Sequence, residues 1–307
     1  MSKIFVAGSF NVDITCYAPR IPRHGETVPG TSANISSGGK GFNQATACAH
    51  AGSEVIMLAK IGDDPLSSIA RNCFQKEGVS TRLLSVVHGE NTGCAFIEVE
   101  EATAENRIII VSGANAHVGK SDIENAESEI KESDYALTQL ETSMESVEEL
   151  CRMCEKLNKP LILNPAPSRP LQDFVLKSVS IFTPNETEAE FYTGIKIENE
   201  KDAVRAADIL LQKGVKCAII TLGKKGVFYK TMDKSGLIPA PVVEAVDTTG
   251  AGDAFNGALA SRLASGENLE AAMKFACAFA SLSVTKKGAA DSMPTYQEAE
   301  NFMKANY

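Results

Sequence analysis

The stretch DTTGAGDAFNG, Asp247 to Gly257, joins a glycine loop to a helix that carries a carboxylate near its start. Apolar residues recur at helical spacing after Ala251, which predicts that the helix begins there. The first turn of a helix leaves backbone N–H groups without partners and carries the positive end of the dipole. Gly250, Ala251 and Gly252 are therefore predicted to cradle the oxygens of a phosphate.

Asp253 follows this cradle, in a place where a carboxylate would repel a bound phosphate. A hydroxyl that attacks phosphorus loses its proton, and a carboxylate within hydrogen-bond reach can accept it. Asp253 is thus a candidate general base, and the helix dipole is expected to lower its pKa. Taken alone, the motif fits an N-capping aspartate equally well.

The composition limits the class of partner. The chain has 307 residues, a net charge of −9 and a pI near 5.1, which argues against nucleic acid or an anionic membrane surface. The first apolar run, residues 4–7, is too short for a signal peptide, and no stretch reaches membrane-spanning length, so a cytoplasmic protein is expected. The eight cysteines lie mostly in apolar runs and are interpreted as buried hydrophobes.

Strand and helix patterns alternate along most of the chain, which predicts an α/β protein with a parallel sheet. β-prone pieces at residues 15–37, 92–99 and 106–111 interrupt this alternation, and we interpret them as one small β appendage. No linker or repeat divides the chain, so residues 1–307 are expected to form one domain. Strands are predicted at 4–8, 54–60, 81–86, 135–140, 160–164, 179–182 and 217–221, and helices at 45–50, 65–77, 121–131, 146–157, 201–213, from 251, 269–280 and 296–304.

Polar residues follow the predicted strand at 4–8, and ligands of open α/β sheets bind at the carboxyl ends of strands. Asn11 and Asp13 lie there, and a carboxylate that accepts from two adjacent hydroxyls is a common way to hold a polyol. An Asx turn is the alternative. Lys40 and Asn43, in GGKGFNQA, are expected to face the same ligand, although a glycine turn that enters a helix explains this motif too. Glu141 ends a predicted strand on the same side.

Two further motifs suggest a nucleotide. Asn185 and Glu188 are three residues apart at a predicted helix start, where they could face a hydrated cation or form a capping pair. The strand at 217–221 runs into Gly223 and Gly226, which suit close backbone contact with a nucleotide or a plain hairpin turn. No GxxxxGK[ST] occurs, and the GxGxxG fingerprint fails because Gln44 stands where it needs glycine.

The motifs GSFNVD, GGKGFNQA, NPAP, PNETE, TLGKKG and DTTGAGDAFNG occur in this order over almost the whole chain, which resembles the ribokinase branch of the PfkB sugar-kinase family. The resemblance implies a doubly wound, mostly parallel sheet flanked by helices. It also implies a small β-sheet lid, formed by about residues 14–37 and 92–112, that closes over the sugar and serves as a homodimer interface.

The resemblance also assigns roles to single residues, with Asp253 as the catalytic base beside Gly250, Ala251 and Gly252. The implied sugar contacts are Asn11, Asp13, Gly39, Lys40, Asn43 and Glu141. The implied nucleotide positions are Asn185, Thr221, Gly223, Gly226, Gly252 and Cys277. Asn185 and Glu188 are implied to hold Mg²⁺ through water, and Asp247, Thr249, Ser283, Lys286, Gly288 and Ser292 to surround K⁺.

The expected reaction is the transfer of the γ-phosphate of ATP to the primary 5-hydroxyl of a pentose, with D-ribose as the first candidate. Alternatives are a kinase of the same family for deoxyribose, a nucleoside or a phosphorylated sugar, and a sugar sensor without turnover on the same fold. A nicotinamide-dependent dehydrogenase is disfavoured by the failed dinucleotide fingerprint.

Overall fold

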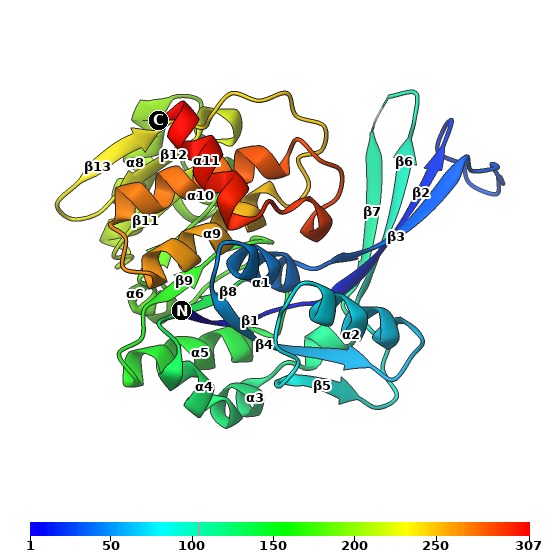
Figure 1. Ribbon diagram of the computed structural model, residues 1–307, viewed down its shortest axis with the longest axis horizontal. Coiled ribbons are helices and arrows are strands. Elements are labelled where there is room, and N and C mark those ends of the chain that lie inside the picture. Colours follow the sequence, from blue (N-terminus) through cyan, green and yellow to red (C-terminus); the bar gives the residue numbers. More distant parts are fainter. Residues whose placement is uncertain (104) are drawn as a thin grey trace.

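The computed structural model describes residues 1–103 and 105–307, which form a large sheet between two layers of helices and a smaller sheet that projects from one side (Figure 1). The large sheet has nine strands in the order β13-β12-β11-β10-β9-β8-β1-β4-β5. Its strands are β1 (Lys3–Ala7), β4 (Glu54–Gly62), β5 (Leu84–Val87), β8 (Tyr135–Thr138), β9 (Leu161–Leu163), β10 (Ile181–Phe182), β11 (Ala218–Thr221), β12 (Val227–Lys230) and β13 (Ser235–Ile238).

The strands of the large sheet are buried on both faces, as β1 illustrates. Alternate side chains point to opposite faces of a strand, so Ile4 and Val6 enter one apolar cluster while Phe5 and Ala7 enter another. Burial on both sides explains why such strands are continuous apolar runs. Helices α1 (Lys40–His50), α2 (Leu66–Lys76), α9 (Ala251–Ala264), α10 (Leu269–Ser283) and α11 (Tyr296–Asn306) cover the first cluster. Helices α3 (Lys120–Asn125), α4 (Glu127–Glu132), α5 (Met144–Lys156), α6 (Asp173–Ser178), α7 (Glu186–Thr193) and α8 (Glu200–Gln212) cover the second.

Strand β1 lies between β8 and β4, and it pairs with both in parallel. The chain adds strands on one side of β1 as far as β5 and then on the other side from β8 onward, so the winding direction reverses at β1 and β8. Ligands of doubly wound sheets bind at the carboxyl ends of the strands at such a reversal. The fold therefore places its expected site just beyond Ala7 and Thr138.

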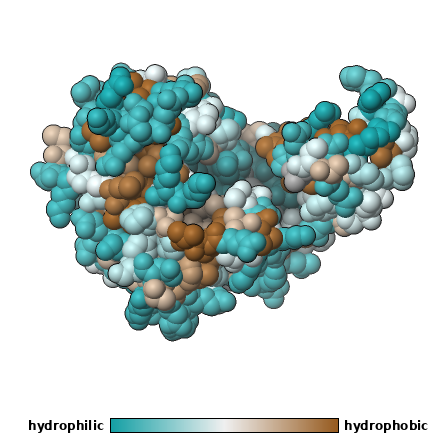
Figure 2. Space-filling model, turned by 90° about the horizontal axis from the view of Figure 1, so that it is seen from above, coloured by the Kyte–Doolittle hydropathy of each residue, from teal (hydrophilic) through white to brown (hydrophobic). Residues whose placement is uncertain are grey.

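The small sheet consists of β2 (Asn11–Ala18), β3 (Ser32–Gly38), β6 (Cys94–Glu100) and β7 (Asn106–Val111), in the order β3-β2-β6-β7. It projects from the side of the body, and the space-filling view shows the surface hollowed between the two (Figure 2). The sheet is anchored at its base by Phe10, Phe42 and Phe74, whose rings pack with centroids 4.9–5.8 Å apart. This aromatic cluster joins the start of the small sheet to α1 and α2.

The structure differs from the sequence prediction in several places. The helix predicted at 121–131 is divided into α3 and α4, and helix α6 was not predicted. Helix α1 begins at Lys40, not at 45, so Lys40 and Asn43 lie within the helix itself. Asn11 and Asp13 belong to strand β2 and not to a turn after β1. Strands β12 and β13 were not predicted; they add an antiparallel edge to the parallel sheet. Within the described residues, no helix combines the length and apolar character needed to cross a membrane.

Candidate active site

The start of α9 has an open, glycine-built geometry. Gly250 is its N-cap with φ of 74°, a left-handed conformation that disfavours other residues, and a Cβ there would lie 2.9 Å from Cβ of Ala289. Gly252, inside the first turn, differs because a Cβ there would meet no atom within 4 Å. The first N–H groups of α9 are therefore bordered by free space, as a phosphate cradle requires.

Asp253 lies in this first turn with only 5% of its surface exposed. Asn43 Nδ2 donates to its Oδ2 and Gln44 Nε2 donates to its Oδ1, both over 2.9 Å. Burial raises the pKa of Asp253, and the nearby Lys40 ammonium and the two amide donors only partly oppose this effect. The expected net lowering of its pKa is thus wrong, because desolvation outweighs the neighbouring groups that lower it.

The predicted sugar contacts Asn11 and Asp13 lie at the base of β2. Asn11 Oδ1 accepts a hydrogen bond from Asn115 Nδ2 over 2.8 Å. Asp13 is half-buried, and burial followed by repulsion from Glu141 raises its pKa to about 6. Gly39, the N-cap of α1, has φ of 86°, and a Cβ there would lie 2.8 Å from the Asn11 backbone nitrogen. Glycine thus lets α1 approach the strand that carries Asn11 and Asp13.

Glu141 closes the other side of this group. One of its carboxylate oxygens, Oε2, accepts from Ser9 Oγ over 2.5 Å and from the backbone nitrogen of Lys40 over 2.9 Å. The second contact places the carboxylate at the positive end of α1. The pKa of Lys40 is raised, mainly by Asp253 and further by Glu141 and Glu188. One lysine thus faces three carboxylates of the site.

The predicted nucleotide positions come from neighbouring strands. Asn185 and Thr221 form a parallel bridge, so the ends of β10 and β11 bring them side by side. Gly223 and Gly226 lie in the turn that joins β11 to β12, the hairpin that was one of the two interpretations of this motif. Cys277 is buried in α10, beside the terminal Tyr307, and its place at the nucleotide stays a prediction.

The comparisons with known proteins decide the family. Residues 1–296 match the pfkB family of carbohydrate kinases. The chain belongs to this family. It is 42% identical over 299 residues to the ribokinase of Haemophilus influenzae, covering 97% of each chain. It is 37% identical over 304 residues to the deoxyribokinase of Salmonella typhi, covering 99% of each. The structure of Arabidopsis thaliana ribokinase complexed with ribose and ATP matches with a TM-score of 0.94 at 30% identity, covering 99% of each chain.

As a pfkB-family member, the protein is an ATP-dependent carbohydrate kinase with the doubly wound, mostly parallel sheet that the sequence predicted. The predicted site residues include four carboxylates, Asp13, Glu141, Glu188 and Asp253, but only one lysine, which faces three of them, so the site carries an excess of negative charge. Such a site favours the arrival of a divalent cation with the nucleotide.

The predicted Mg²⁺ positions, Asn185 and Glu188, form a capping box at the start of α7. Asn185 Oδ1 accepts from the Glu188 nitrogen, and Glu188 Oε2 accepts from the Asn185 nitrogen, both over 2.8 Å. The capping pair is therefore real. Burial raises the pKa of Glu188, opposed by the hydrogen bond from the Asn185 nitrogen and by Lys40. Its second oxygen makes no hydrogen bond among the described residues, which fits a carboxylate that contacts a hydrated Mg²⁺.

The predicted K⁺ positions of this kinase lie on two loops that Asp247 ties together. Asp247 Oδ1 accepts from the backbone nitrogen of Thr249 and its Oδ2 from that of Gly288, both over 2.9 Å. Burial opposes ionisation of Asp247, but these N–H donors outweigh it and lower its pKa. Ser283 Oγ and Ser292 Oγ donate to nearby carbonyls, and Lys286 pairs with Glu298 on the surface. Backbone carbonyls of the two loops thus remain the candidate ligands.

Several polar residues behind the site were not predicted from the sequence. They are Ser9, Gln44, Asn115, Gln139 and Asn164, and each contacts a predicted site residue or its partner. Gln44 and Asn164 stand inside the quoted motifs GGKGFNQA and NPAP. Polar side chains in otherwise apolar segments are the signal that could have found them, because buried polar groups need partners.

Proposed function

We propose that the protein transfers the γ-phosphate of ATP to the primary 5-hydroxyl of a pentose, with D-ribose as the substrate and Asp253 as the general base. The observation that carries this proposal is the buried Asp253 carboxylate held by Asn43 at the open first turn of α9. The resemblance to ribokinases that cover the whole chain supports ribose. The 37% identity to a deoxyribokinase makes 2-deoxyribose the second candidate.

In the proposed reaction, the hydroxyl oxygen of the sugar bonds to the γ-phosphorus while the bond from phosphorus to the leaving ADP oxygen breaks. Asp253 accepts the hydroxyl proton. The raised pKa makes this carboxylate a stronger base than an ordinary aspartate, yet it must be ionised to act. Turnover should therefore fall as the pH falls through that raised pKa. The N–H groups at Gly250 to Gly252 would hold the charge of the travelling group.

Mg²⁺ would enter with ATP and neutralise charge on its phosphates, held through water by Glu188 and Asn185. K⁺ would lie between the loops that Asp247 joins. The residues proposed to surround it are Asp247, Thr249, Ser283, Lys286, Gly288 and Ser292. The eight cysteines are all free in the structure, which supports the proposed cytoplasmic location.

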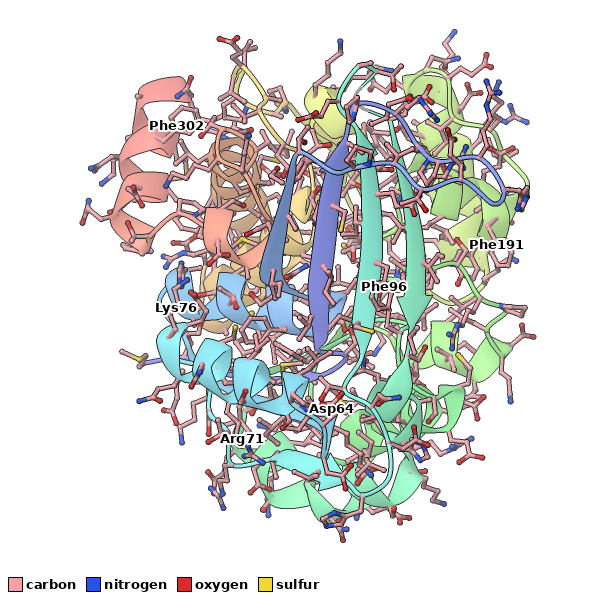
Figure 3. The ribbon with its side chains drawn as sticks, turned by 90° about the vertical axis from the view of Figure 1, so that its right-hand side faces the viewer. Asp64, Arg71, Lys76, Phe96, Phe191 and Phe302 are labelled. Carbon is pink, nitrogen blue, oxygen red and sulfur yellow. The ribbon has the colours of Figure 1, made fainter. Side chains whose placement is uncertain are left out.

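We further propose a homodimer that forms through the small sheet, acting as the lid over the sugar. Ile35, Phe96 and Ile109 lie in one cross-strand row with Ile14 and are 57%, 45% and 66% exposed. Side chains that pair across strands share a face, so this row faces away from neighbouring Asp13. Figure 3 looks onto the small sheet and labels Phe96. A row of exposed apolar side chains on a sheet indicates a protein contact.

The test is an assay of ADP formation with D-ribose, 2-deoxyribose and a nucleoside, run in potassium and then in sodium. Asp253→Asn should lower kcat by orders of magnitude and leave the folded state intact. Asp173→Asn is the matched control, because Asp173 is also a carboxylate in the first turn of a helix, α6, but lies exposed at a distance from the site. Near-normal turnover of Asp253→Asn would overturn the role of Asp253 as the general base. Ribose binding by the wild-type protein without ADP formation would indicate a sugar sensor.

A further inference from the structure

A buried chain of side-chain amides stands behind Asp253. Gln44 has no exposed surface, and its Nε2 donates to Asp253 Oδ1 over 2.9 Å and to Asn164 Oδ1 over 3.1 Å. Asn164 Nδ2 donates in turn to the carbonyl of Thr183 over 2.9 Å. Both hydrogens of the Gln44 amide are thereby used, so this side chain has none to offer a substrate.

The oxygen end of the Gln44 amide is also engaged. Gln139 Nε2 donates to Gln44 Oε1 over 2.6 Å. Turning the Gln44 amide over would set two donors against each other at Gln139 and its oxygen against the Asp253 carboxylate. Gln139 follows β8, at the point where the sheet reverses its winding, and its own Oε1 is buried without a partner among the described residues. The Asp253 carboxylate, which can only accept, is therefore the group that fixes the orientation of the Gln44 amide.

We propose that Gln44 is a positioning residue that occupies Oδ1 of Asp253 and thereby presents Oδ2 to the sugar hydroxyl. This inference rests on the proposed role of Asp253 as the base. Oδ2 already contacts Asn43, whose own Oδ1 is buried and has no partner among the described residues. One sugar hydroxyl would donate to Asn43 Oδ1, while a second, the primary one, gives its own proton to Oδ2 of Asp253.

A donor to a carboxylate favours its ionised form, so removing the donor changes the pH dependence of the reaction as well as its rate. Gln44→Met keeps the length of the side chain but removes the hydrogen bond. The acidic limb of the kcat/KM profile with ribose should move up by about one pH unit, because a hydrogen bond to a charged group is worth about tenfold or more. Gln44→Glu should move it further, because two adjacent carboxylates resist joint ionisation.

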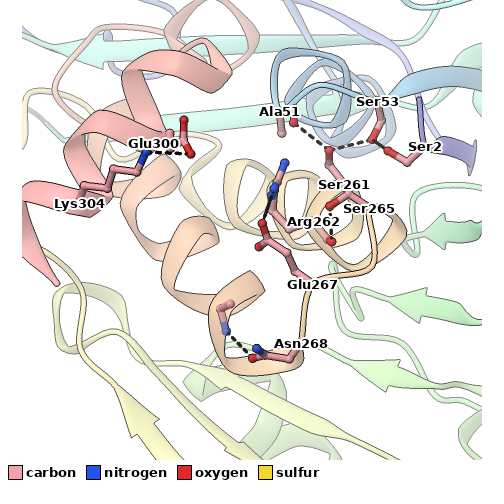
Figure 4. Close-up of polar contacts among 11 residues, drawn as sticks. Ser2, Ala51, Ser53, Ser261, Arg262, Ser265, Glu267, Asn268, Glu300 and Lys304 are labelled. Carbon is pink, nitrogen blue, oxygen red and sulfur yellow. Dashed lines mark hydrogen bonds and ion pairs between the residues drawn. The ribbon is translucent and has the colours of Figure 1, made fainter.

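The matched control lies at the opposite end of the same two helices. Ser261 Oγ on α9 donates to the carbonyl of Ala51, which ends α1, over 3.0 Å, and accepts from Ser53 Oγ over 2.7 Å (Figure 4). Ser261→Ala therefore removes a buried hydrogen bond between α1 and α9 without touching Asp253. Both variants should lower the melting temperature, but only Gln44→Met should displace the acidic limb.

An acidic limb that stays in place in Gln44→Met, while Asp253→Asn is inactive, would overturn the positioning role alone. Normal turnover of Asp253→Asn would overturn the proposed base and the positioning role together. If Gln44→Met does not fold, Gln139→Met serves instead, since it removes the donor to Gln44 Oε1 and so weakens the hold on the Gln44 amide. It should displace the limb in the same direction by a smaller amount, and an unchanged limb in that variant would count equally against the inference.

Discussion

Asn115 donates its side-chain amide to Asn11 Oδ1 over 2.8 Å, although the two residues lie 104 positions apart in the chain. Asn115 is held in turn by Phe10, whose backbone nitrogen donates to it and whose carbonyl accepts from it, both over 2.9 Å. Because the oxygen of Asn11 is engaged, its Nδ2 is left to face the proposed sugar. Asn11 is thus set to donate to a sugar oxygen.

Asn115→Asp should weaken sugar binding by about tenfold or more, because a carboxylate beside Asn11 Oδ1 turns that amide over and removes its donor from the sugar. The KM for ATP should stay unchanged. Calorimetric titration with ribose and with ATP measures the two effects separately, and Asn11→Ala provides the reference for complete loss of the donor. Equal weakening of ribose binding and ATP binding would point to general damage to the fold instead.

Asp13→Asn should stabilise the free protein and impair its function. The folded-state pKa of about 6 lies above the ordinary value of 3.8. Ionised Asp13 therefore lowers the free energy of unfolding above pH 6, and this destabilisation disappears as the pH falls to about 4. The advantage of the variant in melting temperature should therefore grow between pH 4 and 6 and then level off. The same variant should bind ribose more weakly. A melting-temperature difference independent of pH would contradict this account.

Gly252→Ala should keep the fold and lose activity. The added methyl meets no protein atom within 4 Å, and alanine is favoured over glycine inside a helix by about 0.5–1 kcal/mol, so the melting temperature should not fall. In the proposed cradle, however, the methyl stands where phosphate oxygens approach the N–H groups, so kcat should drop at least tenfold. Ala251→Gly is the converse control, because it adds space without obstructing the cradle.

Ile109→Glu should convert the proposed dimer into a monomer, since it places a charge on the most exposed side chain of the apolar row, on the edge strand β7. Light scattering after size-exclusion chromatography measures the mass directly. Met232→Glu is the control, because Met232 is 84% exposed between β12 and β13 on the large sheet. A wild-type protein that is already monomeric would exclude the dimer, and a dimeric Ile109→Glu variant would move the interface elsewhere.

The sequence predicted the parallel strands and the helix start at Ala251 because periodicity and glycine placement are local properties. It could not predict the raised pKa of Asp253, since that shift comes mainly from burial, and burial depends on how α1 and α9 pack. The role of Gln44 could not be predicted for the same reason. Its partners Gln139 and Asn164 are 95 and 120 positions away, and no local pattern reports such contacts.

The small sheet continues directly from the two segments that hold the sugar positions, since β2 begins at Asn11 and β3 ends at Gly38, just before α1. Asn11 and Asp13 therefore lie at the base of the small sheet. The tip of the sheet, at the far end of the eight-residue strand β2, is about 25 Å away at the usual rise of a strand. A rotation of the small sheet about its base would move its tip by many ångströms and Asn11 by very little. If the small sheet closes as the proposed lid, a fluorophore at its tip would report closure with high sensitivity, whereas the proposed sugar contacts at its base would keep nearly the same geometry.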